Sequence, residues 1–114
     1  MGLSEADTRV KLIDPKIREA GWDESKIQRA VVITSGTIID SNGNRRPPRF
    51  ADYILYHGGM AIAIVEAKEE NEDHLKGMKQ AKDYCKMYGA TFAYSSNGHK
   101  IEEFDFNTNK QIIN

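Results

Sequence analysis

The sequence predicts an α/β fold in which a mixed β-sheet is flanked by helices. Segments rich in β-branched residues, typical of strands, alternate with segments whose apolar residues recur at helical spacing. Their order is helix, strands, helix and strands, which packs helices against a sheet. The length of 114 residues, with 39% hydrophobic and 29% charged residues, indicates one folded domain over residues 1–114.

Two short helices are expected first. Ser4 should cap the first helix, because its side-chain oxygen can accept a hydrogen bond from an N–H group of the first turn. Apolar residues then continue at helical spacing as far as Ile13. Asp14 and Pro15 are expected to begin a second helix, which Gly21 ends.

A loop and two strands are expected next. Residues 23–29 are polar and predict a short helical turn or loop, whereas residues 30–34 and 37–40 are rich in β-branched residues and predict strands. Residues 35–36 predict a bulge between these strands, and residues 41–44 predict a turn.

A β-hairpin is expected over residues 51–57 and 62–68, which Gly58 and Gly59 join. Because successive side chains of a strand point to opposite faces, the residues leading through the second strand should divide into two sets. One face should carry Ile62, Ile64, Glu66 and Lys68, and the other Ala61, Ala63, Val65 and Ala67.

Three charged side chains are expected to meet at one end of this hairpin. With a tight turn at the two glycines, Asp52 lies near Val65 and Glu66, and Lys68 shares the face of Glu66. Two carboxylates can share a Mg²⁺ ion, and a lysine beside them can orient water or balance phosphate charge. The alternative interpretation of Glu66 and Lys68 is an ordinary salt bridge at a strand end.

The second half of the chain predicts a helix over residues 74–88, ended by Gly89, and strands over residues 91–95 and 100–106. Residues 107–114 are polar and are expected either to fray or to continue into another domain.

Three further side chains have two interpretations. Gln80 and Tyr84 are neighbours on the helix surface, and they form either a boundary pair or a pair that points over the charged cluster. Glu5 either favours the dipole of the first helix or reaches the same cluster.

Positive charge is concentrated just before Asp52. The net charge of −1 does not indicate general affinity for nucleic acid, so any such surface must be local. Three arginines in a loop stiffened by Pro47 and Pro48 are either phosphate contacts or part of a solvated connector. They are Arg45, Arg46 and Arg49.

The chain predicts a cytoplasmic protein. It shows no signal peptide and no apolar run near the length of a membrane span. Cys85 is its single cysteine, which excludes an internal disulfide and indicates a reducing compartment. Cys85 itself is expected to be a small core residue.

The motifs resemble those of a nuclease superfamily. Asp52 followed by Glu66-Ala67-Lys68 is similar to the D…(D/E)-x-K motif of the PD-(D/E)xK nucleases, although Ala51 stands where that pattern has proline. Gln80 and Tyr84 match the Q-x-x-x-Y motif of a RecB-like branch of that superfamily.

More narrowly, the sequence between Ser4 and Phe106 resembles the N-terminal region of the restriction (HsdR-type) subunit of type I restriction–modification enzymes. Each motif alone is unspecific, but their joint order and spacing are specific. The segments that carry this resemblance are Ser4-Glu5-Ala6-Asp7-Thr8-Arg9, Leu12-Ile13-Asp14-Pro15, Ala20-Gly21-Trp22, Ala51-Asp52-Tyr53, Val65-Glu66-Ala67-Lys68, Gln80-Ala81-Lys82-Asp83-Tyr84 and Ser96-Asn97-Gly98.

The resemblance implies a restriction-endonuclease-like fold and Mg²⁺-dependent hydrolysis of double-stranded DNA, with Mn²⁺ as a substitute. Asp52 and Glu66, with the carbonyl group of Ala67, would hold the metal. Lys68 would position the attacking water and stabilise the developing charge. The other positions implied at this site are Glu5, Gln80 and Tyr84.

The resemblance also implies a longer prokaryotic subunit in which ATP drives a translocase, together with modification and specificity subunits as partners. No Walker motif occurs in these residues, so ATP is expected to bind elsewhere in the subunit. Two alternatives remain at this point. One is a repair exonuclease or Holliday-junction resolvase on the same scaffold, and the other is a non-catalytic docking module for DNA or protein.

Overall fold

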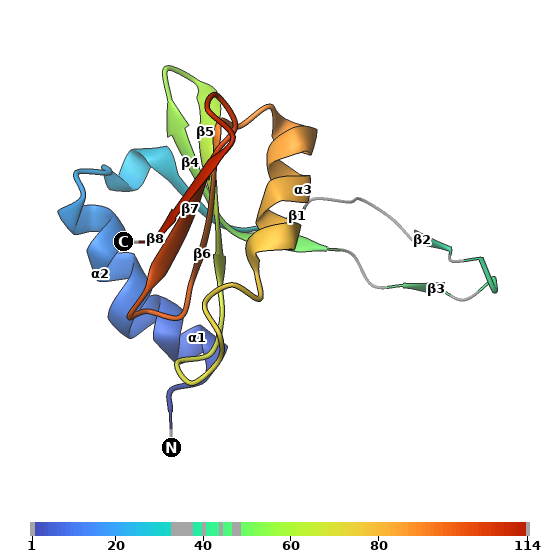
Figure 1. Ribbon diagram of the computed structural model, residues 1–114, viewed down its shortest axis with the longest axis horizontal. Coiled ribbons are helices and arrows are strands. Elements are labelled where there is room, and N and C mark those ends of the chain that lie inside the picture. The colour runs from blue at the N-terminus through green and yellow to red at the C-terminus, as the bar shows by residue number, and fades with distance from the viewer. Residues whose placement is uncertain (1, 33–37, 40, 44, 47–48, 114) are drawn as a thin grey trace.

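A computed structural model describes residues 2–32, 38–39, 41–43, 45–46 and 49–113. Six strands form one sheet in the order β1-β4-β5-β6-β7-β8, with helices on both of its faces (Figure 1). Only β5 and β6 run parallel among the neighbours in this sheet, and the other pairs are antiparallel. The prediction of an α/β fold with a mixed sheet is therefore confirmed.

The N-terminal residues form one continuous helical run rather than two separate helices. Ser4 caps this run as expected. Pro15 has no backbone N–H, and the turn before it widens so that the N–H of Asp14 bonds to the carbonyl oxygen of Arg9, five residues back. The three parts of the run are α1 (Glu5–Thr8), the π-helical segment η1 (Arg9–Ile13) and α2 (Asp14–Glu19).

The sheet begins earlier than expected. A 3₁₀ turn, η2 (Glu24–Lys26), leads into β1 (Ile27–Val32), so residues 27–29 belong to a strand and not to a loop. Ile27 is buried against the core, but Gln28 and Arg29 are exposed because β1 lies at the edge of the sheet. Their polar side chains gave this end of the strand the composition of a loop.

The segment between β1 and β4 is only partly described. β2 (Ile38–Ile39) and β3 (Arg45–Arg46) pair as a small sheet of their own, which lies apart from the main sheet (Figure 1). Residues 33–37, 40, 44 and 47–48 lie outside the described residues. The expected bulge at 35–36 and the stiffening by Pro47 and Pro48 therefore stay predictions.

The central hairpin consists of β4 (Phe50–His57) and β5 (Met60–Ala67), which meet at the predicted glycine turn. The register shifts by one residue between Tyr56, which faces Ala61, and Leu55, which faces Ala63. Ile62 is thus the additional residue of a β-bulge.

The bulge changes the predicted faces of two residues in β5 and the predicted partner of Asp52. It places Ala61 against the α3 side of the sheet and Ile62 in a groove on the opposite side, so the predicted faces are wrong for these two residues. From Ala63 onward the predicted alternation holds. Beyond the bulge Tyr53 faces Val65, and continuing this register sets Asp52 directly opposite Glu66.

The remaining elements follow β5. α3 (Met78–Tyr88) is shorter than expected, since residues 74–77 form a turn, and Gly89 ends it with a φ of 71°. The last three strands are β6 (Phe92–Ser96), β7 (Ile101–Asp105) and β8 (Lys110–Ile113). β8 pairs with β7 at the edge of the sheet, so of the two alternatives for this segment fraying is wrong, and continuation into another domain stays a prediction.

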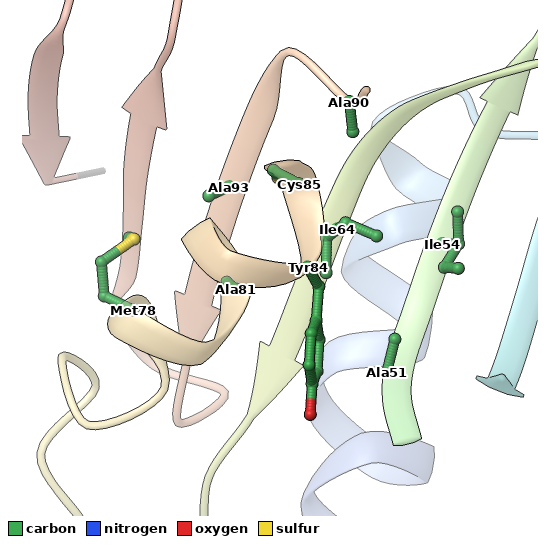
Figure 2. Packing of buried hydrophobic residues seen from close by; sticks show 9 residues of the cluster. All are labelled: Ala51, Ile54, Ile64, Met78, Ala81, Tyr84, Cys85, Ala90 and Ala93. Atoms are coloured by element: carbon green, nitrogen blue, oxygen red, sulfur yellow. The ribbon is translucent and has the colours of Figure 1, made fainter. Parts of the chain in front are cut away.

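Two apolar clusters fill the two sides of the sheet. Ile13 and Ile17 of the N-terminal run pack on one side, and α3 packs on the other. Tyr84 is fully buried in the α3 cluster, together with Ile54 and Ile64 of the sheet (Figure 2). Cys85 is 1% exposed, which confirms it as a core residue. No helix in the described part of the chain is long and apolar enough to cross a membrane.

Candidate active site

The three charged residues of the hairpin meet in one cleft. Asp52, Glu66 and Lys68 line a cavity of about 580 Å³ between β4, β5, α3 and the N-terminal helical run. Asp52 and Glu66 are both buried, at 8% and 2% exposure. The prediction that these side chains share one face and one end of the hairpin is therefore confirmed, although their chemical role is not tested by this placement.

Asp52 is held by one backbone group and one side chain. Its Oδ2 accepts a hydrogen bond of 2.8 Å from the backbone N–H of Ala67, so the carboxylate closes the end of the β4–β5 ladder. Its Oδ1 lies 3.1 Å from Nη1 of Arg9, which comes from the helical run. The one-residue shift at the bulge makes the bond to Ala67 possible, because it brings Asp52 level with the end of β5.

Glu66 is buried beside a second carboxylate. Burial raises the pKa of Glu66 to about 10, with further contributions from the hydrogen-bonding and negative charge of Asp52. Its Oε1 has no hydrogen-bond partner among the groups that the structure describes. A buried carboxylate oxygen without a partner is costly and fits a site that is completed by a cation.

The donor set of the cleft suits a hard divalent cation. Two adjacent carboxylates provide the oxygen ligands that Mg²⁺ prefers, and water molecules usually complete its coordination. Within the described ranges, no group of three histidine, cysteine or acidic residues is arranged to hold a metal ion. Asp52 and Glu66 would thus be the side-chain ligands of a cation in this cleft, and backbone oxygen and water would complete its coordination shell.

The turn before α3 supports both Glu66 and Lys68. A Cβ atom on Gly77 would lie 2.9 Å from Cβ of Glu66 and 3.3 Å from Cε of Lys68. The N–H of Gly77 donates a hydrogen bond of 3.1 Å to Oγ of Ser95 in β6. A glycine at position 77 therefore allows the turn to pack closely against the side chains of Glu66 and Lys68 on the α3 side of the sheet.

Replacing Gly77 by alanine is expected to lower the free energy of unfolding by about 1–3 kcal/mol, because the added methyl group overpacks a contact that cannot open freely. Urea denaturation of the purified chain measures this change. Lys79→Ala on the exposed side of α3 is the control and should stay within about 0.5 kcal/mol of wild type. Equal stability of Gly77→Ala and wild type would contradict the close contact.

Gln80 and Glu5 also line the cleft, whereas Tyr84 is buried behind Gln80 in the core cluster of α3. Gln80 lines the cleft, and its Nε2 donates a hydrogen bond to the hydroxyl oxygen of Tyr84. Burial raises the pKa of Tyr84, and the negative charges of Glu66 and Asp52 add to this shift. Glu5 lines the cleft as well, and burial and the charge of Asp52 raise its pKa. Gln80 and Glu5 therefore lie at the cleft and Tyr84 contacts Gln80 from the core, while the chemical roles of all three stay predictions.

The three arginines of the positive patch separate in the structure. Arg49 lines the cleft beside Asp52. Arg45 and Arg46 form β3, which pairs with β2 away from the main sheet. For Arg45 and Arg46 only the backbone is described, so their part in the positive patch stays a prediction.

The sequence interpretation missed Arg9, which lines the cleft, and Gly77, which packs against Glu66 and Lys68. Arg9 lies four residues after Glu5, and this spacing sets two residues on the same side of a helix. Once Glu5 was considered, Arg9 was therefore a candidate. No comparable signal marks Gly77, because its φ of −88° is open to any residue and its role comes from contacts with β5 and β6.

Comparisons with known proteins identify several relatives. A family model described as the second domain of the type I restriction enzyme EcoKI endonuclease subunit matches residues 38–111. The chain is 35% identical over 100 residues to the type I restriction enzyme EcoAI endonuclease subunit of Escherichia coli, covering 84% of this chain and 12% of that subunit. It is 33% identical over 105 residues to the EcoKI subunit of the same species, covering 81% of this chain and 9% of that subunit.

A solved structure shares the whole fold. It is a fragment described as an HsdR subunit of a type I restriction enzyme from Vibrio vulnificus, and it matches 100% of this chain and 23% of its own chain. The TM-score is 0.86 and the sequence identity is 40%. The present chain therefore spans a small part of each of these relatives.

Proposed function

Because this chain belongs to the family of type I restriction enzyme endonuclease (HsdR-type) subunits, we propose that it is the Mg²⁺-dependent nuclease domain of such a subunit and hydrolyses phosphodiester bonds of double-stranded DNA. The observation that carries this proposal is the cleft in which Asp52, Glu66 and Lys68 meet, with a buried oxygen of Glu66 that has no partner among the described groups.

In the proposed site, Asp52 and Glu66 hold the cation together with the carbonyl oxygen of Ala67, and Mn²⁺ can substitute for Mg²⁺. The bound cation acidifies water and stabilises negative charge on a phosphoryl oxygen. The backbone bond from Ala67 to Asp52 keeps one carboxylate oriented while the site is loaded.

The chain's own residues supply the remaining functions. Lys68 orients the attacking water and balances the charge that develops on the phosphate. Gln80 lines the cleft and donates a hydrogen bond to the hydroxyl oxygen of the buried Tyr84, and this pair would position Lys68, the cation's ligands or the DNA backbone. Glu5 also lines the cleft and would contribute an outer-sphere contact to the cation.

The proposed setting is a larger complex in the prokaryotic cytoplasm. Other parts of the subunit would bind ATP and translocate DNA, and modification and specificity subunits would recognise the DNA sequence. The family model that matches describes a second domain, so the N-terminal position in the subunit stays a prediction. The names of the relatives favour restriction cleavage over a repair exonuclease or a junction resolvase.

The central test is Asp52→Asn in the subunit assembled with its modification and specificity partners. We expect cleavage of DNA to fall below detection, since one oxygen ligand loses its charge while the side chain keeps its size. Gel analysis of plasmid DNA at saturating Mg²⁺ and ATP measures the product. Asp7→Asn, at an exposed acidic residue of α1, is the matched control and should cleave at the wild-type rate.

A non-catalytic docking module is the remaining alternative. In that case Asp52→Asn and wild type would behave alike, and Mn²⁺ would not bind to the purified chain. Either result would remove the nuclease proposal.

The arginines give a separate prediction for DNA binding. Replacing Arg45, Arg46 and Arg49 by glutamine should reduce the slope of log K against log salt by about 0.9 for each phosphate that the variant no longer neutralises. Fluorescence anisotropy with a labelled duplex, in Ca²⁺ to prevent cleavage, measures this slope. If Arg49→Gln alone accounts for the whole change, β3 does not contact DNA. An unchanged slope in the triple variant would identify the segment as a plain connector.

A further inference from the structure

Arg9 is the one charged side chain in the cleft that the proposed reaction does not use. Its Nη1 lies 3.1 Å from Oδ1 of Asp52 and forms an ion pair with it. The Arg9 side chain is 30% exposed and that of Asp52 is 10% exposed, so the pair lies at the mouth of the cleft. In the part of the chain that the structure describes, no other group is seen to accept a hydrogen bond from the Arg9 guanidinium.

The two oxygens of Asp52 are held in different ways. Oδ2 is fixed by the backbone of β5, which cannot move without opening the hairpin. Oδ1 is held by a long side chain that keeps access to solvent. Arg9 is thus the partner of Asp52 that can leave, and Oδ1 is the oxygen that it would release.

The charges of the cleft indicate why Arg9 would leave. Glu5, Asp52 and Glu66 supply three carboxyl groups, and the basic residues that line the cleft are also three, Arg9, Arg49 and Lys68. Three basic groups therefore already lie in the cleft before any cation binds. A divalent cation adds two positive charges next to Asp52, and the guanidinium at the same carboxylate then experiences repulsion in a partly buried site.

We propose that Arg9 is an internal counter-ion of the cleft, which a divalent cation displaces from Asp52 and which then binds a phosphate group of DNA. A guanidinium suits both partners, because its fork of N–H groups matches carboxylate and phosphate geometry equally well. The cation-binding half of the proposal concerns this chain alone, and the phosphate half rests on the proposed nuclease function.

Titration of the purified chain with Mn²⁺, followed by the electron paramagnetic resonance signal of unbound Mn²⁺, tests the first half. Arg9→Met should bind Mn²⁺ about 3- to 10-fold more tightly than wild type, because the competing charge is gone while the length of the side chain is kept. Arg9→Lys should stay within about twofold of wild type, since it keeps the charge. Arg18→Met removes an exposed arginine of the same helical run and should change nothing.

Weaker or unchanged Mn²⁺ binding by Arg9→Met would overturn the proposal and make Arg9 a residue that merely orients Asp52. If wild type binds Mn²⁺ and Arg9→Met binds it no more tightly, only the Arg9 proposal is refuted. If neither protein binds Mn²⁺, the proposed nuclease function is refuted as well. Circular dichroism and urea denaturation of each variant establish that it is folded.

Duplex binding in the presence of Ca²⁺ tests the second half. Arg9→Met should lower affinity for DNA and reduce the salt slope by about 0.9, the value expected when one phosphate is no longer neutralised. Without a divalent cation, wild type and variant should show the same slope, because Arg9 is then engaged by Asp52. A slope difference that is independent of the cation would contradict the displacement.

Discussion

Lys68→Ala is expected to lower the rate of DNA cleavage by the assembled enzyme by about 10²- to 10⁴-fold, the range typical of a positioned group that assists proton transfer or stabilises developing charge. The free energy of unfolding should change by less than about 0.5 kcal/mol, because the ammonium group lies in a solvent-filled cleft and is not part of the core. The backbone N–H of Lys68 keeps its 2.8 Å bond to the carbonyl oxygen of Ser96 in the variant.

The same variant separates the lysine from the metal ligands. Lys68 is not a proposed ligand, so Lys68→Ala should bind Mn²⁺ at least as tightly as wild type, whereas Asp52→Asn should not. Lys79→Ala, on the exposed side of α3, is the control for loss of a lysine and should cleave normally. Single-turnover assays with plasmid DNA measure the rate. Cleavage at the wild-type rate by Lys68→Ala would refute its assignment.

Glu66→Gln should make the cation-free chain more stable, by an amount that grows as the pH rises. Burial raises the pKa of Glu66 to about 10, while an unfolded glutamate titrates near ~4.3. Between these values the folded state keeps a proton that the unfolded state releases, so raising the pH favours unfolding of wild type. The free energy of unfolding changes with pH in both proteins, and the slopes of this dependence should differ between variant and wild type by at most about 1.4 kcal/mol per pH unit.

Urea denaturation between pH 6 and pH 9 in EDTA measures this difference. Titratable groups away from the cleft contribute equally to both proteins, so the difference reports Glu66 and the groups that interact with it. Glu69→Gln, at an exposed neighbour, is the matched control and should give a difference that does not depend on pH. A Glu66→Gln variant that is less stable than wild type at pH 8 would show that Glu66 is not a buried, cation-seeking carboxyl group.

Binding of a divalent cation is expected to make wild type more stable than Glu66→Gln. A cation that binds only the folded state stabilises it by about 2.7 kcal/mol at 100 times its dissociation constant. Wild type should gain this stability in Mn²⁺, and the gain should increase with pH because the cation competes with the proton on Glu66. Glu66→Gln should gain little. Glu66 would then lower the free energy of unfolding without a bound cation and raise it when a cation is bound.

Much of the fold was predicted because its signals are local. The glycine turn between β4 and β5, the cap at Ser4 and the stop at Gly89 each depend on a few neighbouring residues. The errors came where packing overrides local preference. Fraying was one of two alternatives for residues 107–114, but pairing with β7 places β8 in the sheet. The polar start of β1 is a strand because it adds to the edge of the sheet.

The site shows the same division. Alternation along β5 and a tight turn were sufficient to predict that Asp52, Glu66 and Lys68 meet at one end of the hairpin. The turn alone gave a register that was one residue away from the observed one, because the bulge at Ile62 has no clear signature in the sequence. Tyr84 was expected at the boundary of α3, but it is buried between that helix and the sheet.

Residue types at fixed spacing along the chain were sufficient to identify the family, the class of fold and the charged residues of the cleft. The depth at which Glu66 is buried, the close packing of Gly77 against it and the pairing of Arg9 with Asp52 became known only from the folded structure. These contacts join residues far apart in the chain, and their energies depend on the distance and solvent exposure that only packing sets.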